Sequence, residues 1–403
     1  MYTVTIHKPR FKFKISDLSV LLSYIMIALI NCSLFRVNIA FHLIVLGLLM
    51  IVSFNKIPLN KLWPIIILDL ALGIMYLKAG QFGMGFFDPI NNLVKFIYVF
   101  ETYVLYLIIQ QFEEKTRKRL IEFAVWCLII TMIISLYYNF FIDPTAIRFR
   151  PEQYTFICTF GQYYEGVIVI SIIICTMFSQ KNVNYLKSLL VIGILGLVFL
   201  VGNLVTGLVL AIGGMGMALI LSKVKKLKFG IAFIGILGLI ALSLRSYIIE
   251  ILLQISEWEF FNKITADKIV AIANLLSGRN QVDTLSTRNA LANYSLNSFK
   301  ENPWFGIGYK GYHIGTVGCH QEWSDMLAVF GIVGVILIGI VFLFLVWQIY
   351  KNIHTQLDFI CFSISLILIF ILGFLNPALT EEALLAALVI APNSSLLFRK
   401  KGK

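Results

Sequence analysis

Two arginines in the segment 248–322 are the side chains best suited to bind an anion in this 403-residue chain. Arg279 and Arg288 stand nine residues apart, and the pattern after Arg288 predicts that it lies in the first turn of a helix. Guanidinium groups bind phosphate oxygens in a bidentate manner, and the free N–H groups of a helix start also attract an anion. The two arginines are therefore predicted to clamp one diphosphate; the alternative is that each is a solvated loop cation.

His320, at the end of the same segment, is the candidate for proton transfer. An imidazole can accept a proton near neutral pH, which makes this residue a candidate general base. Glu322 follows two residues later and is either a second candidate base or a partner that orients the histidine. A partly buried structural role for His320 stays open as the alternative.

The composition says which elements must position these groups. Hydrophobic residues make up 59% of the chain and charged residues 13%, with a mean hydropathy of +0.88. A soluble globular chain is about half apolar and about a quarter charged. The sequence therefore predicts an all-α integral membrane protein, and it excludes a soluble enzyme, a secreted disulfide scaffold and a disordered chain.

Twelve apolar runs are each long enough to cross the hydrocarbon core of a bilayer as a helix. The predicted spans are 18–36, 37–54, 62–79, 92–112, 120–142, 161–179, 185–201, 203–221, 229–247, 323–349, 357–375 and 381–398. Nine spans thus lie within residues 1–247 and three within 323–403. They are separated by one large loop, 248–322, which is longer than a simple connection needs to be.

Two acidic residues lie within these apolar runs, Asp69 in the third and Glu101 in the fourth. A charge that faces lipid costs at least a few kcal/mol, about 2.5–3.5 on insertion scales, so both side chains are predicted to face the interior. They form either a protonated, hydrogen-bonded pair or part of a proton pathway.

The formal net charge of +12 is explained by the loops rather than by a nucleic-acid partner. Lys and Arg gather in the N-terminal segment, in alternate short loops and at the C-terminus, whereas the opposite loops contain few. Positive loops mark the cytoplasmic side. Both termini are therefore predicted to be cytoplasmic, and the 248–322 loop to lie on the outer face.

The large loop is predicted to contain short helices. Residues Tyr247–Phe261 resemble an interfacial helix, and Asn262–Ser277 has apolar residues at helical spacing before Gly278. Leu285–Asn302 is predicted as a third helix, with Ser286 or Thr287 as its N-cap, ended by Pro303.

The order of motifs in this region resembles that of the O-antigen ligase and polymerase superfamily. An arginine that opens a helix is followed by Asn302–Gly308 (NPWFGIG), by a His-polar-x-Trp motif at His320 and by the sequence FGIVG ending at Gly334. Within that superfamily, the chain looks most like capsular or O-antigen polysaccharide polymerases. The local match covers 288–334, and the plan of twelve spans with one late outer loop matches over the whole chain.

The resemblance implies a glycosyltransferase in the cytoplasmic (inner) membrane of a bacterium, with its active site on the outer face. Such polymerases move a growing glycan from polyprenyl diphosphate onto the non-reducing end of another lipid-linked repeat unit. Donor and acceptor are both lipid-linked oligosaccharides in the bilayer, and a chain-length regulator is a further candidate partner. No nucleotide sugar, cofactor or metal is implied, and no carboxylate cluster for Mg²⁺ is visible in the outer loops.

The resemblance also implies roles for individual residues. The family's arginine and histidine map onto Arg288 and His320, which with Glu322 are the candidate catalytic residues. The remaining residues are candidate substrate contacts for diphosphate or sugar: Arg279, Arg150, Arg148, Lys95, Trp304 and Tyr309. Simpler roles stay open for the last three, since lysines snorkel and aromatic residues gather at membrane interfaces.

Three other functions stay open at this point. One is a ligase, which moves the glycan to a different acceptor. Another is a flippase or other transporter of lipid-linked oligosaccharides, although the chain shows no repeat of two similar halves. The last is a peptidoglycan polymerase of the shape-elongation-division type, for which Asp267 or Asp283 would be the residue to test.

Overall fold

The fold was analysed in a computed structural model of the chain. The structure describes residues 15–35, 39–54, 57, 59–78, 92–149, 154, 156–202, 205–223, 245–258, 266, 267, 269, 270, 273, 274, 277, 283–308, 317 and 321–400. Within them it is a helical protein without strands, apart from an isolated bridge between Val183 and Arg399. This agrees with the predicted all-α class.

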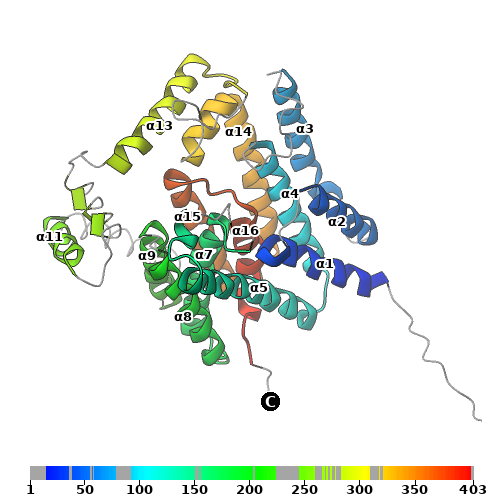
Figure 1. Ribbon diagram of the computed structural model, residues 1–403. Coiled ribbons are helices and arrows are strands. Elements are labelled where there is room, and N and C mark those ends of the chain that lie inside the picture. Colours follow the sequence, from blue (N-terminus) through cyan, green and yellow to red (C-terminus); the bar gives the residue numbers. More distant parts are fainter. Residues whose placement is uncertain are drawn as a thin grey trace, which may run out of the picture.

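The longer helices follow the apolar runs of the sequence (Figure 1). They are α1 (Ile15–Asn31), α2 (Ile39–Val52), α3 (Trp63–Lys78), α4 (Asn92–Ile109), α5 (Glu114–Phe141), α7 (Phe160–Ser179), α8 (Tyr185–Val201), α9 (Val205–Lys223), α14 (Glu322–Lys351) and α15 (Gln356–Leu375). The other helices are α6 (Ala146–Phe149), α11 (Arg245–Ser256), α13 (Asp283–Glu301) and α16 (Glu381–Leu385). The predicted span 229–247 lies almost wholly outside the described residues.

Four helices are long and apolar enough to cross a membrane, namely α5, α7, α14 and α15. Shorter apolar helices occur at Asp17–Asn31, Phe41–Val52, Phe96–Ile109, Tyr185–Val201 and Gly207–Lys223. These helices indicate a membrane-embedded protein; the full set of twelve crossings stays a prediction.

The surface of α14 supports a lipid environment. Its exposed side chains include Ile336, Ile340, Leu343 and Trp347, which recur at helical spacing and are each more than half exposed. An apolar stripe of this kind is costly in water but favourable against lipid.

The last predicted span, 381–398, is wrong as a single regular helix. Only α16 is α-helical; a π-helix over Ala386–Ile390 and a 3-10 helix over Ala391–Leu396 continue it. The N–H of Ala391 bonds to the carbonyl of Ala386, five residues back. Pro392 lacks an N–H group and so cannot continue the regular hydrogen-bond ladder.

The boundaries in the large loop also differ from prediction. Helix α11 ends at Ser256, five residues before the predicted Phe261. The described residues between 266 and 277 are helical, as predicted, while Gly278 lies outside the described part. Helix α13 begins at Asp283, two residues before the predicted Leu285, and it ends before Pro303 as predicted. An acidic residue such as Asp283 is itself favourable at a helix start.

Helix α7 lies in the core of the bundle, in contact with α8, α9, α15 and α16. Of its twenty residues, those from Gly161 to Ile173 are all buried. Near the C-terminus, Asp358 at the start of α15 accepts hydrogen bonds from Ser394 and Ser395. These bonds hold the segment after α16 against the bundle. In Figure 1, α13 and the beginning of α14 lie at the upper end of the molecule and the C-terminus at the lower end.

Candidate functional site

Two of the motifs that carry the family resemblance, the loop 302–308 and the FGIVG segment, interlock in space. Helix α14 is interrupted at Gly331, where φ is 63° and ψ is −174°. In an unbroken helix the N–H groups of Ile332 and Val333 would bond to the carbonyls of Ala328 and Val329. Both pairs of groups instead bond to the loop 302–308. The bonds run from Ile307 N–H to Ala328 O (2.9 Å), Gly308 N–H to Val329 O (2.9 Å), Ile332 N–H to Pro303 O (2.8 Å) and Val333 N–H to Trp304 O (3.1 Å). We call this four-bond contact the motif lock.

The motif lock requires glycine at two positions. A Cβ atom at Gly306 would lie 2.3 Å from the carbonyl oxygen of Val329, and one at Gly331 would lie 2.5 Å from the carbonyl carbon of Trp304. Both glycines also have positive φ, 65° and 63°, which L side chains rarely adopt. The glycines noted in the sequence therefore shape a backbone contact between the loop and a membrane helix.

The motif lock also ties α13 to α14, which pack against each other. The Ser295 hydroxyl of α13 donates a hydrogen bond to Asp325 of α14 (2.7 Å), and both side chains are buried. Arg288 belongs to α13, and His320 lies two residues before the start of α14 in the sequence. Helix α13, which carries Arg288, and helix α14, which begins two residues after His320, are thus joined in one unit.

Several predicted site residues lie outside what the structure describes. Arg279, Arg150, Tyr309 and His320 are in segments that are not described. Lys95, Arg148 and Arg288 lie on described helices, α4, α6 and α13, but their side chains are not described. Because α13 begins at Asp283, Arg288 is the sixth residue of the helix and lies in its second turn. The prediction that it lies in the first turn is wrong.

Two further candidates have described side chains. Trp304 is 64% exposed, so its indole is open to a ligand or to lipid. Glu322 is fully buried, and its carboxylate accepts hydrogen bonds from the N–H groups of Ala378 (3.0 Å) and Leu379 (3.5 Å). Its observed contacts therefore hold the connection between α15 and α16.

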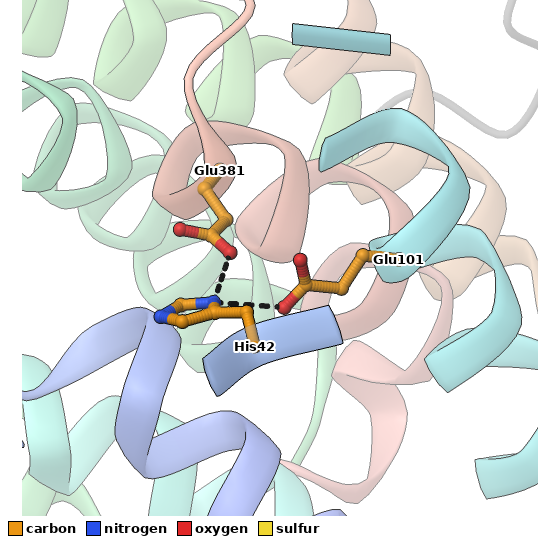
Figure 2. A group of neighbouring side chains, drawn as sticks. All are labelled: His42, Glu101 and Glu381. Carbon is orange, nitrogen blue, oxygen red and sulfur yellow. Dashed lines mark hydrogen bonds and ion pairs between the residues drawn. The ribbon is translucent and has the colours of Figure 1, made fainter. Parts of the chain in front are cut away.

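A second group of polar side chains lies inside the bundle, and the sequence predicted only one of its members, Glu101. His42 of α2, Glu101 of α4 and Glu381 of α16 converge inside the bundle (Figure 2). The His42 Nδ1 atom lies 2.7 Å from Glu381 Oε1 and 3.2 Å from Glu101 Oε1. Glu101 indeed faces the interior, as predicted, but its observed partner is His42. The Oδ1 atom of Asp69 has no hydrogen-bond partner among the described residues.

The signal for the missing members was present in the sequence. His42 and Glu381 both fall within predicted apolar spans, as Glu101 does. A polar residue inside such a span usually faces a partner in the bundle. Which residues are partners depends on the packing of α2, α4 and α16, which periodicity alone does not give.

A polar network lies near this cluster, at the end of the bundle predicted to be outer. The Asn31 amide of α1 donates to the fully buried Glu165 of α7 (2.5 Å), and Gln162 donates to the Asn31 carbonyl (3.0 Å). The Thr159 hydroxyl caps α7 and donates to Glu382 (2.7 Å), the residue after Glu381. With Glu101 of the cluster, carboxylates from α4, α7 and α16 are therefore gathered at this end.

The arrangement offers two kinds of chemistry. The unit formed by α13 and α14 includes the candidates Arg288 and Glu322, and in the sequence it is flanked by Arg279 and His320. The buried cluster of His42, Glu101 and Glu381 offers nitrogen and carboxylate ligands. No family model, curated protein or solved structure matches the chain.

Proposed function

We propose that this protein is a glycosyltransferase that extends a polysaccharide on the outer face of a bacterial cytoplasmic membrane. A growing glycan passes from polyprenyl diphosphate to the non-reducing end of a lipid-linked repeat unit. The observation that carries the proposal is the motif lock, because it joins two of the sequence motifs on which the family resemblance rests.

The motif lock supports the proposal through the elements it connects. It consists of backbone hydrogen bonds, and it fixes α13 against the N-terminal part of α14. Arg288 is on the first of these helices, and His320 lies two residues before the second in the sequence. A fixed relation between an anion-binding group and a base is what transfer from a diphosphate leaving group needs.

In the proposed reaction the bond between the anomeric carbon and the diphosphate oxygen breaks, and a bond from the acceptor hydroxyl oxygen to the same carbon forms. Arg288, with Arg279 and Arg150, stabilises the negative charge that develops on the leaving diphosphate. His320 takes the proton of the acceptor hydroxyl. Displacement in a single step inverts the configuration of that carbon.

The other residues have supporting roles in this proposal. Lys95 and Arg148 contribute positive charge near the lipid diphosphate, and Trp304 and Tyr309 contact sugar rings. Glu322 orients the start of α14 through its bonds to the backbone of Ala378 and Leu379. Because arginines carry the charge, the step itself uses no Mg²⁺.

A transporter of the same lipid-linked units is the second candidate function. It is favoured by the fully buried acids Glu101 and Glu165, since carboxylates inside helical bundles often line ion pathways. A ligase is a third candidate, which differs from the polymerase only in the acceptor.

The test is an assay with purified protein and a lipid-diphosphate-linked repeat unit, followed by gel analysis of the products. A polymerase gives a ladder spaced by one repeat unit. Arg288→Ala and His320→Ala are expected to abolish the ladder while the protein remains folded in detergent. Lys300→Ala, which removes an exposed cation from the same helix α13, is the matched control and is expected to retain it.

Three results would contradict the proposal in different ways. Wild-type ladders in both variants would remove Arg288 and His320 from the reaction. Movement of the unit across proteoliposomes without any ladder would indicate a transporter. A ladder that disappears after chelation and returns with Mg²⁺ would show that a metal, rather than arginine alone, neutralises the leaving group.

A further inference from the structure

We infer that His42, Glu101 and Glu381 form a binding site for one divalent transition-metal ion inside the helix bundle. The inference does not depend on the proposed glycosyltransferase activity. It rests on the geometry, charge and chemical type of the three side chains, which come from α2, α4 and α16 (Figure 2).

The spacing of the donor atoms fits a shared ion. All three donor atoms lie within 4.8 Å of one another, and Nδ1 lies 2.7 Å and 3.2 Å from the two carboxylate oxygens. Ligands about 2.1 Å from an octahedral ion, at right angles, are about 3.0 Å apart. The two short separations lie on either side of that value.

A hydrogen-bond network alone explains the cluster less well. Both carboxylates approach the same nitrogen, and one Nδ1–H group has a single proton to share between them. The Glu101 side chain is fully buried, and its Oε2 atom has no hydrogen-bond partner in the described part of the chain. An unpartnered carboxylate oxygen at this depth is costly, and a metal ion would satisfy it.

The charge balance points in the same direction. Two carboxylates and a neutral imidazole carry a charge of −2, which a divalent ion cancels. Two like charges this close repel strongly in a medium of low dielectric constant. A bound divalent ion would leave the cluster neutral inside the membrane.

The donor set indicates which ions fit. Imidazole nitrogen suits zinc, iron, copper and nickel, and carboxylates extend the range to manganese. Magnesium and calcium prefer oxygen ligands only, so the histidine selects against them. The Glu381 side chain, which is 11% exposed, is the most accessible of the three and marks the direction from which an ion enters.

The ion would hold three helices of the bundle together. The three ligands are far apart in the sequence, and they connect α2 and α4 with α16. Helix α16 contacts α1, α4 and α7, so a ligand on it links the C-terminal segment to the N-terminal half of the bundle. Binding to the folded state alone would stabilise the protein.

The test uses full-length protein purified in detergent, stripped with a chelator and titrated with Mn²⁺. We expect saturable binding of one ion, with a rise in the temperature of unfolding. Glu101→Gln and Glu381→Gln are each expected to weaken Mn²⁺ binding at least about tenfold. Glu165→Gln is the matched control, because Glu165 is an equally buried carboxylate outside the cluster, and it is expected to bind Mn²⁺ as the wild type does.

A measurement on wild-type protein keeps the inference falsifiable if the variants do not fold. Electron-spin-echo spectra of bound Mn²⁺ should show coupling to an imidazole nitrogen, the signature of His42. Absence of saturable Mn²⁺ binding, bound Mn²⁺ without nitrogen coupling, or equal weakening by Glu165→Gln would each overturn the site. None of these outcomes bears on whether the protein forms a glycan ladder.

Discussion

Replacing Gly331 by alanine is the sharpest test of the motif lock. Gly331 has φ of 63° and ψ of −174°, a conformation that is essentially restricted to glycine. An added Cβ would lie 2.5 Å from both the carbonyl carbon and the oxygen of Trp304 and 2.6 Å from the nitrogen of Gly306. All three atoms belong to the backbone of the loop, so no side chain can rotate away to make room.

The cost follows from these contacts. A non-glycine residue in such a conformation costs about 1–3 kcal/mol. Forcing an extra carbon into a packed contact costs about 1–3 kcal/mol more. If the loop moves away instead, the two bonds from Ile332 and Val333 are lost, at about 1 kcal/mol each. Each route leads to a destabilisation of about 3 kcal/mol.

Thermal unfolding in detergent, followed by tryptophan fluorescence, would measure this loss. A domain of about 150–250 residues loses about 2–4 °C for each kcal/mol, and a larger protein loses less, so Gly331→Ala is expected to lower the Tm by about 5 °C. Gly339→Ala is the matched control, because Gly339 lies in the same helix and an added Cβ there has no neighbour within 4 Å. Alanine is the better helix former, so the control should keep the wild-type Tm or exceed it.

The reasoning fails if Gly331→Ala and Gly339→Ala unfold at the same temperature. That result would mean that the backbone of 302–308 does not contact α14 as described. A lower Tm with an unchanged glycan ladder would keep the motif lock but remove its link to the proposed activity.

Two other substitutions test neighbouring contacts by thermal unfolding. Glu322→Ala leaves the buried N–H groups of Ala378 and Leu379 without their acceptor and should lower the free energy of unfolding by about 2–5 kcal/mol. Glu322→Gln keeps an acceptor oxygen and should cost less. Loss of the ladder in a fully stable Glu322→Gln protein would instead indicate a catalytic carboxylate. Thr159→Ala removes the N-cap of α7 and the bond to Glu382 and should cost about 1–2 kcal/mol, which Thr159→Ser restores. Equal stability of the alanine and serine proteins would contradict the capping role.

The positions of the helices could be predicted from the sequence because long apolar runs have few other uses. The predicted span 185–201 coincides with α8, and 357–375 differs from α15 by one residue. Hydropathy reports contact with lipid but not the register of backbone hydrogen bonds. The change to a π-helix after Leu385 and the break at Gly331 were therefore not predicted, although Pro392 and the glycines were visible.

For the candidate site, too, the sequence predicts the local motifs but not the contacts between them. The loop 302–308 and the FGIVG segment were recognised as motifs, because glycine and proline leave a clear local signal. Their contact is between backbone groups, and backbone groups carry no residue type from which a partner could be predicted. The same holds for His42, whose imidazole meets Glu101 and Glu381 only through the tertiary fold.

The two functional regions meet at one short segment, residues 376–380, and this connection decides how experiments on them should be interpreted. Glu322, at the start of α14, holds the backbone of this segment at Ala378 and Leu379. Glu381, immediately after it, belongs to the buried cluster. A change at Glu322 therefore acts on the α14 side of the segment without removing a ligand of the cluster. A variant at Glu101 removes a ligand and leaves the bonds between Glu322 and this segment in place, so a ladder lost in a fully stable Glu322→Gln protein but kept in Glu101→Gln would locate the transfer chemistry at α14.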